Sequence, residues 1–273
     1  MPHNITAKIQ EHYDLASPYY KELWGQHIHH GYWITGKESK EVAAQNLVDL
    51  LIAKAGLKRG AKVLDVGCGV GGTSIFLARE WGCDVTGITI SPVQVEMATE
   101  AAAGAGLAHP PKFLVNDAND ISVSGPFDVI WSVEMISHLN NRDNLFRRAS
   151  ELLRPGGKMC ITDWWKEEGL SEAQTKKYIE PIEHGMLVDL PTFSEYARHI
   201  TAHGFRLMWY EDISARVART WDITSESIRP KAIWDFATKH TSALVDFLHS
   251  FKAMRAGFKS GAFRYPVMVL EKI

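Results

Sequence analysis

The sequence predicts an α/β fold built on a doubly wound, mostly parallel sheet of seven strands. Between residue 62 and about residue 163, short apolar segments alternate with amphipathic helical segments, as is typical of a parallel sheet covered on both faces. A glycine-rich turn within residues 63–72 directly follows the first apolar segment, the position where such sheets bind their ligands. The 273 residues, 45% of them hydrophobic, suffice for one large α/β domain or for a core with a cap.

The alternating region supplies five of the strands, and two helices precede it. Residues 5–24 and 38–55 are predicted to be helical, and an aromatic and histidine-rich stretch joins them. The predicted strands of the alternating region are residues 62–66, 84–88, 112–115, 127–131 and 157–163, and its predicted helices are residues 72–81, 92–105 and 142–153. The start of the second of these helices is marked by Ser91, which can cap it, and by Pro92 at its first position.

The part of the chain after this region is predicted to be mostly helical. Residues 165–203 and 214–260 are rich in Trp, Phe and Met, and a strand-like segment at residues 205–210 interrupts them. Residues 265–270 suit a buried last strand. Because no repeat or flexible linker separates the extra helices from the core, we expect them to pack onto it as a lid.

Composition excludes several classes of protein. Thirty basic and thirty-two acidic residues give a net charge of −2, which offers no electrostatic basis for nucleic-acid binding and favours a small-molecule ligand. The N-terminus lacks the apolar core of a signal peptide, and no apolar run approaches the roughly 20 residues of a membrane span. The three cysteines are scattered, which indicates neither a disulfide framework nor a zinc site. We therefore expect a cytoplasmic protein. The sequence leaves the oligomeric state open and is compatible with a homodimer.

The residues around the glycine turn indicate the charge of the ligand. Gly67, Gly69 and Gly72 have the spacing of a dinucleotide-binding turn, which by itself is a weak signal shared with oxidoreductases. Asp65 lies two residues before the first glycine, where its carboxylate would repel a pyrophosphate but would suit an ammonium or a sulfonium group. The turn therefore predicts a positively charged ligand.

The next strand also departs from the dinucleotide pattern. That pattern places an acid about 20 residues further on, at the end of the second strand, to bind a ribose. Asp84 is near this spacing but begins the strand, whereas Thr89 and Gln94 follow its end. Neutral side chains can also hold ribose hydroxyls, so we expect Thr89 and Gln94 to do so.

Three separate motifs carry a family resemblance. The resemblance is to the class I S-adenosylmethionine-dependent methyltransferases. Their glycine motif resembles DVGCG at residues 65–69, and their second strand with its turn resembles GITISPVQ at residues 87–94. The turn before their fifth strand resembles LLRPGGK at residues 152–158. Residues 12–15 and 24–33 resemble the N-terminal stretches of the tocopherol-type, sterol-type and mycolic-acid-type enzymes. The resemblance covers most of the chain and implies S-adenosylmethionine as the cofactor.

The resemblance also implies which residues contact this cofactor. The residue that matches Asp117 accepts a hydrogen bond from the adenine amino group, and those that match Tyr13 and His29 lie near the methionine carboxylate. The expected cofactor-binding residues are Asp65, Gly67, Gly69, Thr89, Ile90, Gln94, Asn116, Asp117, Ala118, Tyr13 and His29.

The implied organisation has four parts. Residues 1–60 are expected to cover the cofactor site and residues 61–164 to form the binding core. Residues 165–260 are expected to form the helical lid, with one core strand near 205–213, and residues 261–273 to end in the last core strand.

The segment after the fourth strand holds the candidate base. Methyl transfer to a hydroxyl needs in-line attack and removal of the hydroxyl proton, a task that suits a histidine. His138 follows Glu134 in the spacing Glu-x-x-x-His that resembled enzymes carry. Asp163 matches an acid that ends the fifth strand in some sugar-hydroxyl methyltransferases, where it could orient the base or share its proton. We therefore expect His138, Asp163 and Glu134 to be catalytic.

The acceptor is expected to be a small lipophilic molecule, methylated at a hydroxyl oxygen. Methylation at carbon or nitrogen of a prenyl, sterol or aromatic acceptor is the first alternative, and a binding protein or an oxidoreductase without methyl transfer is the second. No metal is expected, because adjacent histidines within residues 27–30 point in opposite directions on an extended segment and have no spaced carboxylate partner. The residues expected to line the acceptor site are Trp24, Trp33, Trp164 and Trp165.

Overall fold

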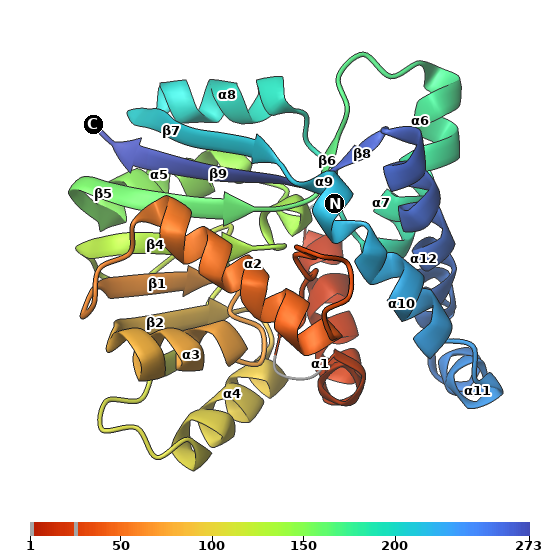
Figure 1. Cartoon of the computed structure of the whole chain (residues 1–273), viewed down its shortest axis with the longest axis horizontal. Helices are drawn as coiled ribbons and strands as arrows, with labels where there is room; N and C mark the ends of the chain where they lie inside the picture. Colours follow the sequence, from red (N-terminus) through yellow and green to blue (C-terminus); the bar gives the residue numbers. More distant parts are fainter. Residues whose placement is uncertain (1–2, 25–26) are drawn as a thin grey trace.

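A computed structural model describes residues 3–24 and 27–273. Seven strands form one sheet in the order β3-β2-β1-β4-β5-β9-β7, in which β9 runs antiparallel to both of its neighbours (Figure 1). The strands are β1 (Lys62–Val66), β2 (Asp84–Thr89), β3 (Lys112–Val115), β4 (Phe127–Val133), β5 (Leu153–Thr162), β7 (Phe205–Asp212) and β9 (Pro266–Lys272). The predicted doubly wound, mostly parallel sheet of seven strands is confirmed.

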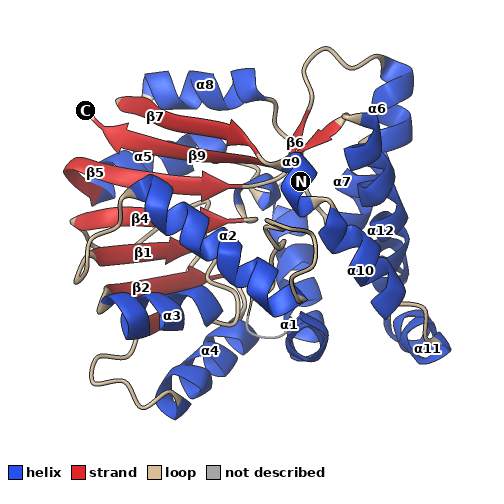
Figure 2. Ribbon diagram, in the orientation of Figure 1, coloured by secondary structure: helices blue, strands red, loops and turns tan. Residues whose placement is uncertain are grey.

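Helices cover both faces of this sheet (Figure 2). Val63 of β1 joins a core cluster that includes residues of α2 and α3, whereas its neighbour Leu64 joins a second cluster with residues of α5 and α8. Neighbouring residues on a strand point to opposite faces, so the apolar run of β1 serves both clusters. The bounds of the helices against the sheet are α2 (Lys40–Ala55), α3 (Gly72–Trp81), α4 (Pro92–Gly104), α5 (Arg142–Leu152) and α8 (Phe193–Ala202).

The other helices gather beyond the carboxyl ends of the parallel strands, on the right in Figure 1. There α12 packs against α7, α10 and α11, beside a two-stranded ribbon of β6 and β8. These elements are α1 (His3–Trp24), β6 (Trp165–Lys166), α6 (Glu172–Tyr178), α7 (Glu180–Met186), α9 (Ser214–Val217), α10 (Arg219–Ser227), α11 (Lys231–His240), α12 (Ser242–Ser260) and β8 (Phe263–Arg264). Among the described residues, no helix is both long enough and apolar enough to cross a membrane.

Two details differ from what the sequence predicts. α2 packs across a face of the sheet, because its buried residues Leu47, Val48 and Leu51 join the core cluster of β1. Of the described residues before residue 60, those that line the cavity at the carboxyl edge belong to α1 and to residues 28–30. β5 begins at Leu153 and not at residue 157, because Leu153 pairs with Phe127 before the register shifts.

Candidate functional site

A cavity lies at the carboxyl edge of the sheet, between the strand ends and the extra helices. Residues that follow β1 to β4 form one side of its wall, and residues of α1, the loop after α1, α7, α10 and α12 form the other. The cavity therefore lies where ligands bind in open α/β sheets. The expected site residues in its wall are Tyr13, His29, Gly67, Gly69, Thr89, Ile90, Gln94, Asn116, Asp117, Ala118, Glu134, His138 and Trp164.

The glycine turn after β1 combines close packing with open space. At Gly67, whose φ is +81°, a Cβ atom would lie 2.3 Å from Cγ of Met135. At Gly69, whose φ is +52°, a Cβ atom would meet nothing within 4 Å, and this residue lines the cavity. Positive φ favours glycine at both positions. Gly67 thus lets the turn pack against the segment after β4, whereas Gly69 leaves room for a ligand.

Asp65 lies in the protein interior and not in the cavity wall. Its Oδ2 accepts a hydrogen bond of 2.6 Å from Oγ of Ser74, in the first turn of α3. Burial raises the pKa of the Asp65 carboxyl group to about 6, although the Ser74 hydrogen bond acts in the opposite direction. In this structure the Asp65 carboxylate connects β1 to the start of α3.

The ends of β2 and β3 present polar groups to the cavity. Oγ1 of Thr89 donates a 2.6 Å hydrogen bond to Oε1 of Gln94, and Nε2 of Gln94 donates to Oγ of Ser17 on α1 at 3.1 Å. Oδ1 of Asp117 accepts two hydrogen bonds from Asn119, as in a capped turn. The expected ribose and adenine residues thus lie on one side of the cavity, next to α1.

His29 brings a buried nitrogen without a partner to the cavity. Its Nδ1 lies 2.8 Å from the backbone oxygen of His30, and because a carbonyl can only accept, Nδ1 carries the hydrogen. Nε2 is then an acceptor, and among the described residues it has no hydrogen-bond partner. Burial lowers the pKa of His29, so the ring stays neutral. An unpaired buried acceptor of this kind suits a donor group on a ligand.

His138 also has a fixed tautomer. It ends a single 3₁₀ turn, Ile136–His138, where its Nδ1 lies 3.1 Å from the backbone oxygen of Leu187 and therefore donates to it. Nε2 lies 2.9 Å from Oη of Tyr13, from which it accepts. Burial lowers the pKa of His138 to about 4 and raises that of Tyr13, so at neutral pH the imidazole is uncharged and the phenol keeps its proton.

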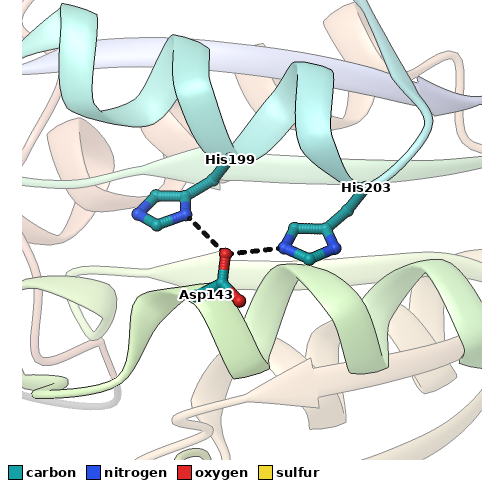
Figure 3. Close-up of side chains that lie close together, drawn as sticks. All are labelled: Asp143, His199 and His203. Carbon is teal, nitrogen blue, oxygen red and sulfur yellow. Dashed lines mark hydrogen bonds and ion pairs between the residues drawn. The ribbon is translucent and has the colours of Figure 1, made fainter.

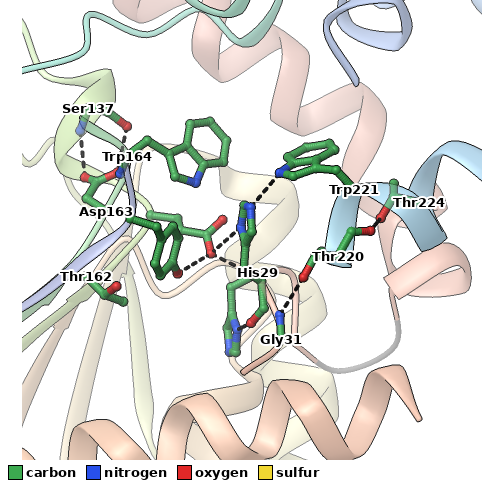
Figure 4. Close-up of polar contacts among 12 residues, drawn as sticks. His29, Gly31, Ser137, Thr162, Asp163, Trp164, Thr220, Trp221 and Thr224 are labelled. Atoms are coloured by element: carbon green, nitrogen blue, oxygen red, sulfur yellow. Dashed lines mark hydrogen bonds and ion pairs between the residues drawn. The ribbon is translucent and has the colours of Figure 1, made fainter. Parts of the chain in front are cut away.

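Asp163 does not contact His138. Its two carboxylate oxygens accept hydrogen bonds from the backbone N and Oγ of Ser137, at 2.8 and 2.9 Å, and from the backbone N of Trp164, at 2.7 Å. The expectation that Asp163 orients or shares the proton of the base is therefore wrong for this structure, because the Leu187 carbonyl takes that place. Asp163 instead fixes the 3₁₀ turn that carries His138, as Figure 4 shows for Ser137 and Asp163.

Glu134 is the centre of a buried hydrogen-bond network. Its Oε1 accepts from the backbone N of His30 at 2.7 Å, from Nδ1 of His30 at 3.0 Å and from Oη of Tyr265 at 2.6 Å. Nε1 of Trp221 donates to Nε2 of His30 at 2.6 Å, so the ring of His30 donates to Glu134 through Nδ1 (Figure 4). Burial acts to raise the pKa of Glu134, but the contacts with His30 and Tyr265 outweigh it, and the pKa is lowered.

This network joins parts of the chain that are far apart in sequence. Glu134 itself has a φ of 52°, unusual for a residue other than glycine, which indicates local backbone strain at the site. Sequence reasoning did not assign a role to His30, Tyr265 or Trp221. No spacing could have identified them, because 104 and 131 residues separate Glu134 from His30 and Tyr265.

The tryptophans expected at the acceptor site lie in different environments. Trp164 lines the cavity, and its Nε1 has no partner among the described residues. Trp165 lies in the core cluster of α5 and α8, stacked on Tyr196 at 4.5 Å, because successive residues of an extended segment point in opposite directions. Trp33 is buried beside α10, outside the cavity wall, so the expectation is wrong for Trp33 and Trp165. The side chain of Trp24 lies outside the described residues.

Acidification below pH 6.5 should destabilise the protein. Burial lowers the pKa of His12 and His138 to about 4 and that of His27 to about 3, from 6.5. Between the folded-state pKa values and the unfolded value of 6.5, the unfolded chain binds protons that the folded protein does not. The free energy of unfolding therefore falls as pH falls, by about 2 kcal/mol per histidine at pH 5. Asp65 and Asp163, whose pKa values rise from 3.8 to about 6, act in the opposite sense by about 1 kcal/mol each.

Urea unfolding at pH 7 and pH 5 measures this effect. The three histidines outweigh the two aspartates, so the midpoint should be lower at pH 5. Replacing His138 with asparagine removes one of the titrating groups and should reduce the difference between the two midpoints. Equal midpoints for the native protein at both pH values would contradict the assignment of neutral, buried histidines.

The sheet order, the glycine turn and the cavity at the carboxyl ends of the strands together define a class I S-adenosylmethionine-dependent methyltransferase. The chain belongs to the mycolic acid cyclopropane synthetase family, whose model matches residues 2–264. It is a small-molecule methyltransferase, and S-adenosylmethionine is its cofactor.

Individual relatives and solved structures are similar to the chain in sequence or in fold. The chain is 31% identical to the chloroplastic tocopherol O-methyltransferase of Arabidopsis thaliana, over 97% of this chain and 81% of that protein. Its fold matches the [4+2]-cyclase SpnF with a TM-score of 0.83 and 27% identity, over 97% of this chain and 94% of that one. It also matches the mycolic acid cyclopropane synthase CmaA1, solved with SAH and CTAB, with a TM-score of 0.87 and 21% identity over 98% of both chains.

Proposed function

We propose that this protein methylates a hydroxyl oxygen of a small lipophilic acceptor, with His138 as the general base. The observation that carries the proposal is the fixed tautomer of His138. Its Nδ1 is held by the Leu187 carbonyl, so the lone pair of Nε2 is available at the cavity. An imidazole acts as a base only when it is unprotonated, and burial, which lowers the pKa of His138 to about 4, keeps it unprotonated at neutral pH.

The residues around the cavity fit the cofactor. The open space at Gly69 admits a ligand next to the glycine turn, and the unpaired Nε2 of His29 can accept a hydrogen bond from the ammonium group of the methionine part. Thr89 with Gln94 would hold the ribose and Asp117 the adenine amino group. When bound, the cofactor supplies an electrophilic methyl group. The role of Asp65 is to fix the turn through Ser74.

The acceptor hydroxyl would take the place of Tyr13 at His138. In this structure Oη of Tyr13 donates a hydrogen bond to Nε2 of His138 at 2.9 Å. An acceptor hydroxyl that replaces Tyr13 would donate its hydrogen bond to the same nitrogen. As the oxygen takes the methyl group, whose bond to the cofactor sulfur would break, the hydroxyl proton would move to Nε2 of His138. The other hydrogen stays on Nδ1, which keeps donating to the Leu187 carbonyl. The resulting imidazolium then releases its proton to solvent. Positioning of the two reactants supplies most of the rate.

The wall of the cavity supports a lipophilic acceptor. Apolar side chains of α1, the loop after α1 and the extra helices face it together with Trp164, and such walls bind apolar ligands with a few oriented polar groups. These side chains are Ile9, Ile28, Met186, Trp221 and Phe247. The name of the Arabidopsis relative, an O-methyltransferase of tocopherol, agrees with this reading. In this proposal the elements at residues 165–260 form a lid that selects the acceptor.

A panel of acceptors with labelled S-adenosylmethionine tests the proposal. Lipophilic phenols and alcohols are compared with the same molecules lacking the hydroxyl and with prenyl and sterol alkenes, and NMR locates the new methyl group. We expect label on oxygen and none with the hydroxyl-free molecules. Label on carbon would replace the proposal with C-methylation. Turnover of a polyene to a ring without label would indicate cyclase chemistry of the kind that the name of SpnF describes.

A further inference from the structure

Three potential metal ligands meet outside the cavity, between α5 and α8. Asp143 lies in the first turn of α5, His199 lies in the last turn of α8, and His203 caps the end of that helix. Oδ1 of Asp143 lies 3.2 Å from Nδ1 of His199 and 2.8 Å from Nε2 of His203 (Figure 3). None of the three lines the cavity, and none belongs to the proposed catalytic or cofactor-binding set.

The spacing of these atoms is close to that of a bound metal ion. The three ligand atoms all lie within 4.8 Å of one another. In a tetrahedral zinc site, metal–ligand distances of about 2.0–2.2 Å place ligand atoms roughly 3.4 Å apart. The two distances to Asp143, 3.2 and 2.8 Å, would therefore lengthen by roughly 0.2 and 0.6 Å on metal binding.

The cluster is both supported and accessible. The ring of His199 stacks on Phe146 of α5 with 5.4 Å between centroids and an interplanar angle of 13°, which holds one imidazole in place. The side chains of His199 and His203 are 24% and 15% exposed, whereas that of Asp143 is 61% exposed. The imidazoles are thus packed against the protein, and the carboxylate side is open to an incoming ion and to a water molecule as fourth ligand.

We propose that Asp143, His199 and His203 bind a divalent transition-metal ion, with Zn²⁺ as the best fit, and that the ion links α5 to α8. Two imidazoles and one carboxylate form a donor set typical of zinc, whereas Mg²⁺ and Ca²⁺ prefer oxygen ligands alone. The ion replaces the two hydrogen bonds at Asp143 with bonds to all three side chains. This inference revises the expectation from sequence that the chain holds no metal.

Calorimetric titration with ZnCl₂ tests the site, on protein without a histidine tag and after treatment with a chelator. We expect one Zn²⁺ per chain, no binding of Mg²⁺ at the same concentration, and a rise of the melting temperature by roughly 4–8 °C when free Zn²⁺ is 100-fold above its dissociation constant. His203→Ala should weaken zinc binding at least ~100-fold and abolish the rise.

Two further variants separate metal binding from a purely structural role. Asp143→Asn keeps an acceptor oxygen for the histidines but is a poor zinc ligand, so it should lose zinc binding and keep the melting temperature of the metal-free protein. His184→Ala removes a 76% exposed histidine that pairs with Asp246 elsewhere and should bind zinc as the native protein does. Equal zinc affinity in the native, His203→Ala and Asp143→Asn proteins, or no zinc binding by the folded native protein, would overturn the proposal.

Discussion

Replacing His138 with asparagine should lower turnover at least ~100-fold and leave binding of S-adenosylhomocysteine intact. The asparagine amide can still donate to the Leu187 carbonyl, as Nδ1 does at 3.1 Å in the native protein, but no atom takes the place of Nε2. The variant therefore removes the proton acceptor and keeps the local hydrogen bond. Transfer of a labelled methyl group at saturating cofactor measures turnover, and calorimetric titration measures cofactor binding.

His12→Asn is the matched control for this experiment. His12 is another histidine of the cavity wall, and partial burial lowers its pKa to about 4 as well, but the proposed mechanism gives it no proton to carry. Its loss should change turnover far less than the loss of His138. If both variants lose turnover equally, the effect is one of cavity shape, and if His138→Asn retains native turnover, His138 is not the base.

Replacing Glu134 with alanine should lower the free energy of unfolding by about 3–5 kcal/mol, because a buried donor that loses its acceptor costs roughly 1–3 kcal/mol and three donors lose theirs. Oε1 of Glu134 accepts from the backbone and the ring of His30 and from Oη of Tyr265, and alanine leaves all three donors buried without an acceptor. Urea unfolding at pH 7 measures the loss.

A double variant shows whether the network is the cause. Tyr265→Phe removes one of the donors that Glu134→Ala leaves unpaired, so the two substitutions together should cost less than the sum of their separate effects. Glu134→Gln keeps an acceptor oxygen and should cost less than Glu134→Ala. Strictly additive losses would mean that Glu134 and Tyr265 stabilise the protein independently.

The regular part of the fold could be predicted because its signals are local. The strands β1 and β4 are short, mostly apolar runs, and the start of α4 is set by Ser91, whose Oγ accepts from the backbone N of Gln94. The start of β5 could not be predicted, since the pairing of Leu153 with Phe127 depends on a neighbouring strand and not on the residues after α5.

The candidate site was predictable at the strand ends and not beyond them. Thr89 ends a strand, and Asp117 and His138 follow strands. The order of these strands along the chain already places their carboxyl ends at one edge of the sheet, and all three residues line the cavity. Asp163 also follows a strand, yet it caps the turn at Ser137 and does not contact His138. Position along a strand fixes which edge a residue reaches, but not which atom its side chain meets.

By itself, the sequence determined the sheet, the glycine turn and the family, because periodicity and short motifs act over a few residues. Only the tertiary structure decided the partners of the polar side chains. The Leu187 carbonyl fixes the tautomer of His138, and Tyr265 and His30 meet at Glu134, across separations of 49, 131 and 104 residues. The physical reason is that a buried polar group is stable only with a partner, and packing of distant elements determines which partner comes within hydrogen-bond distance.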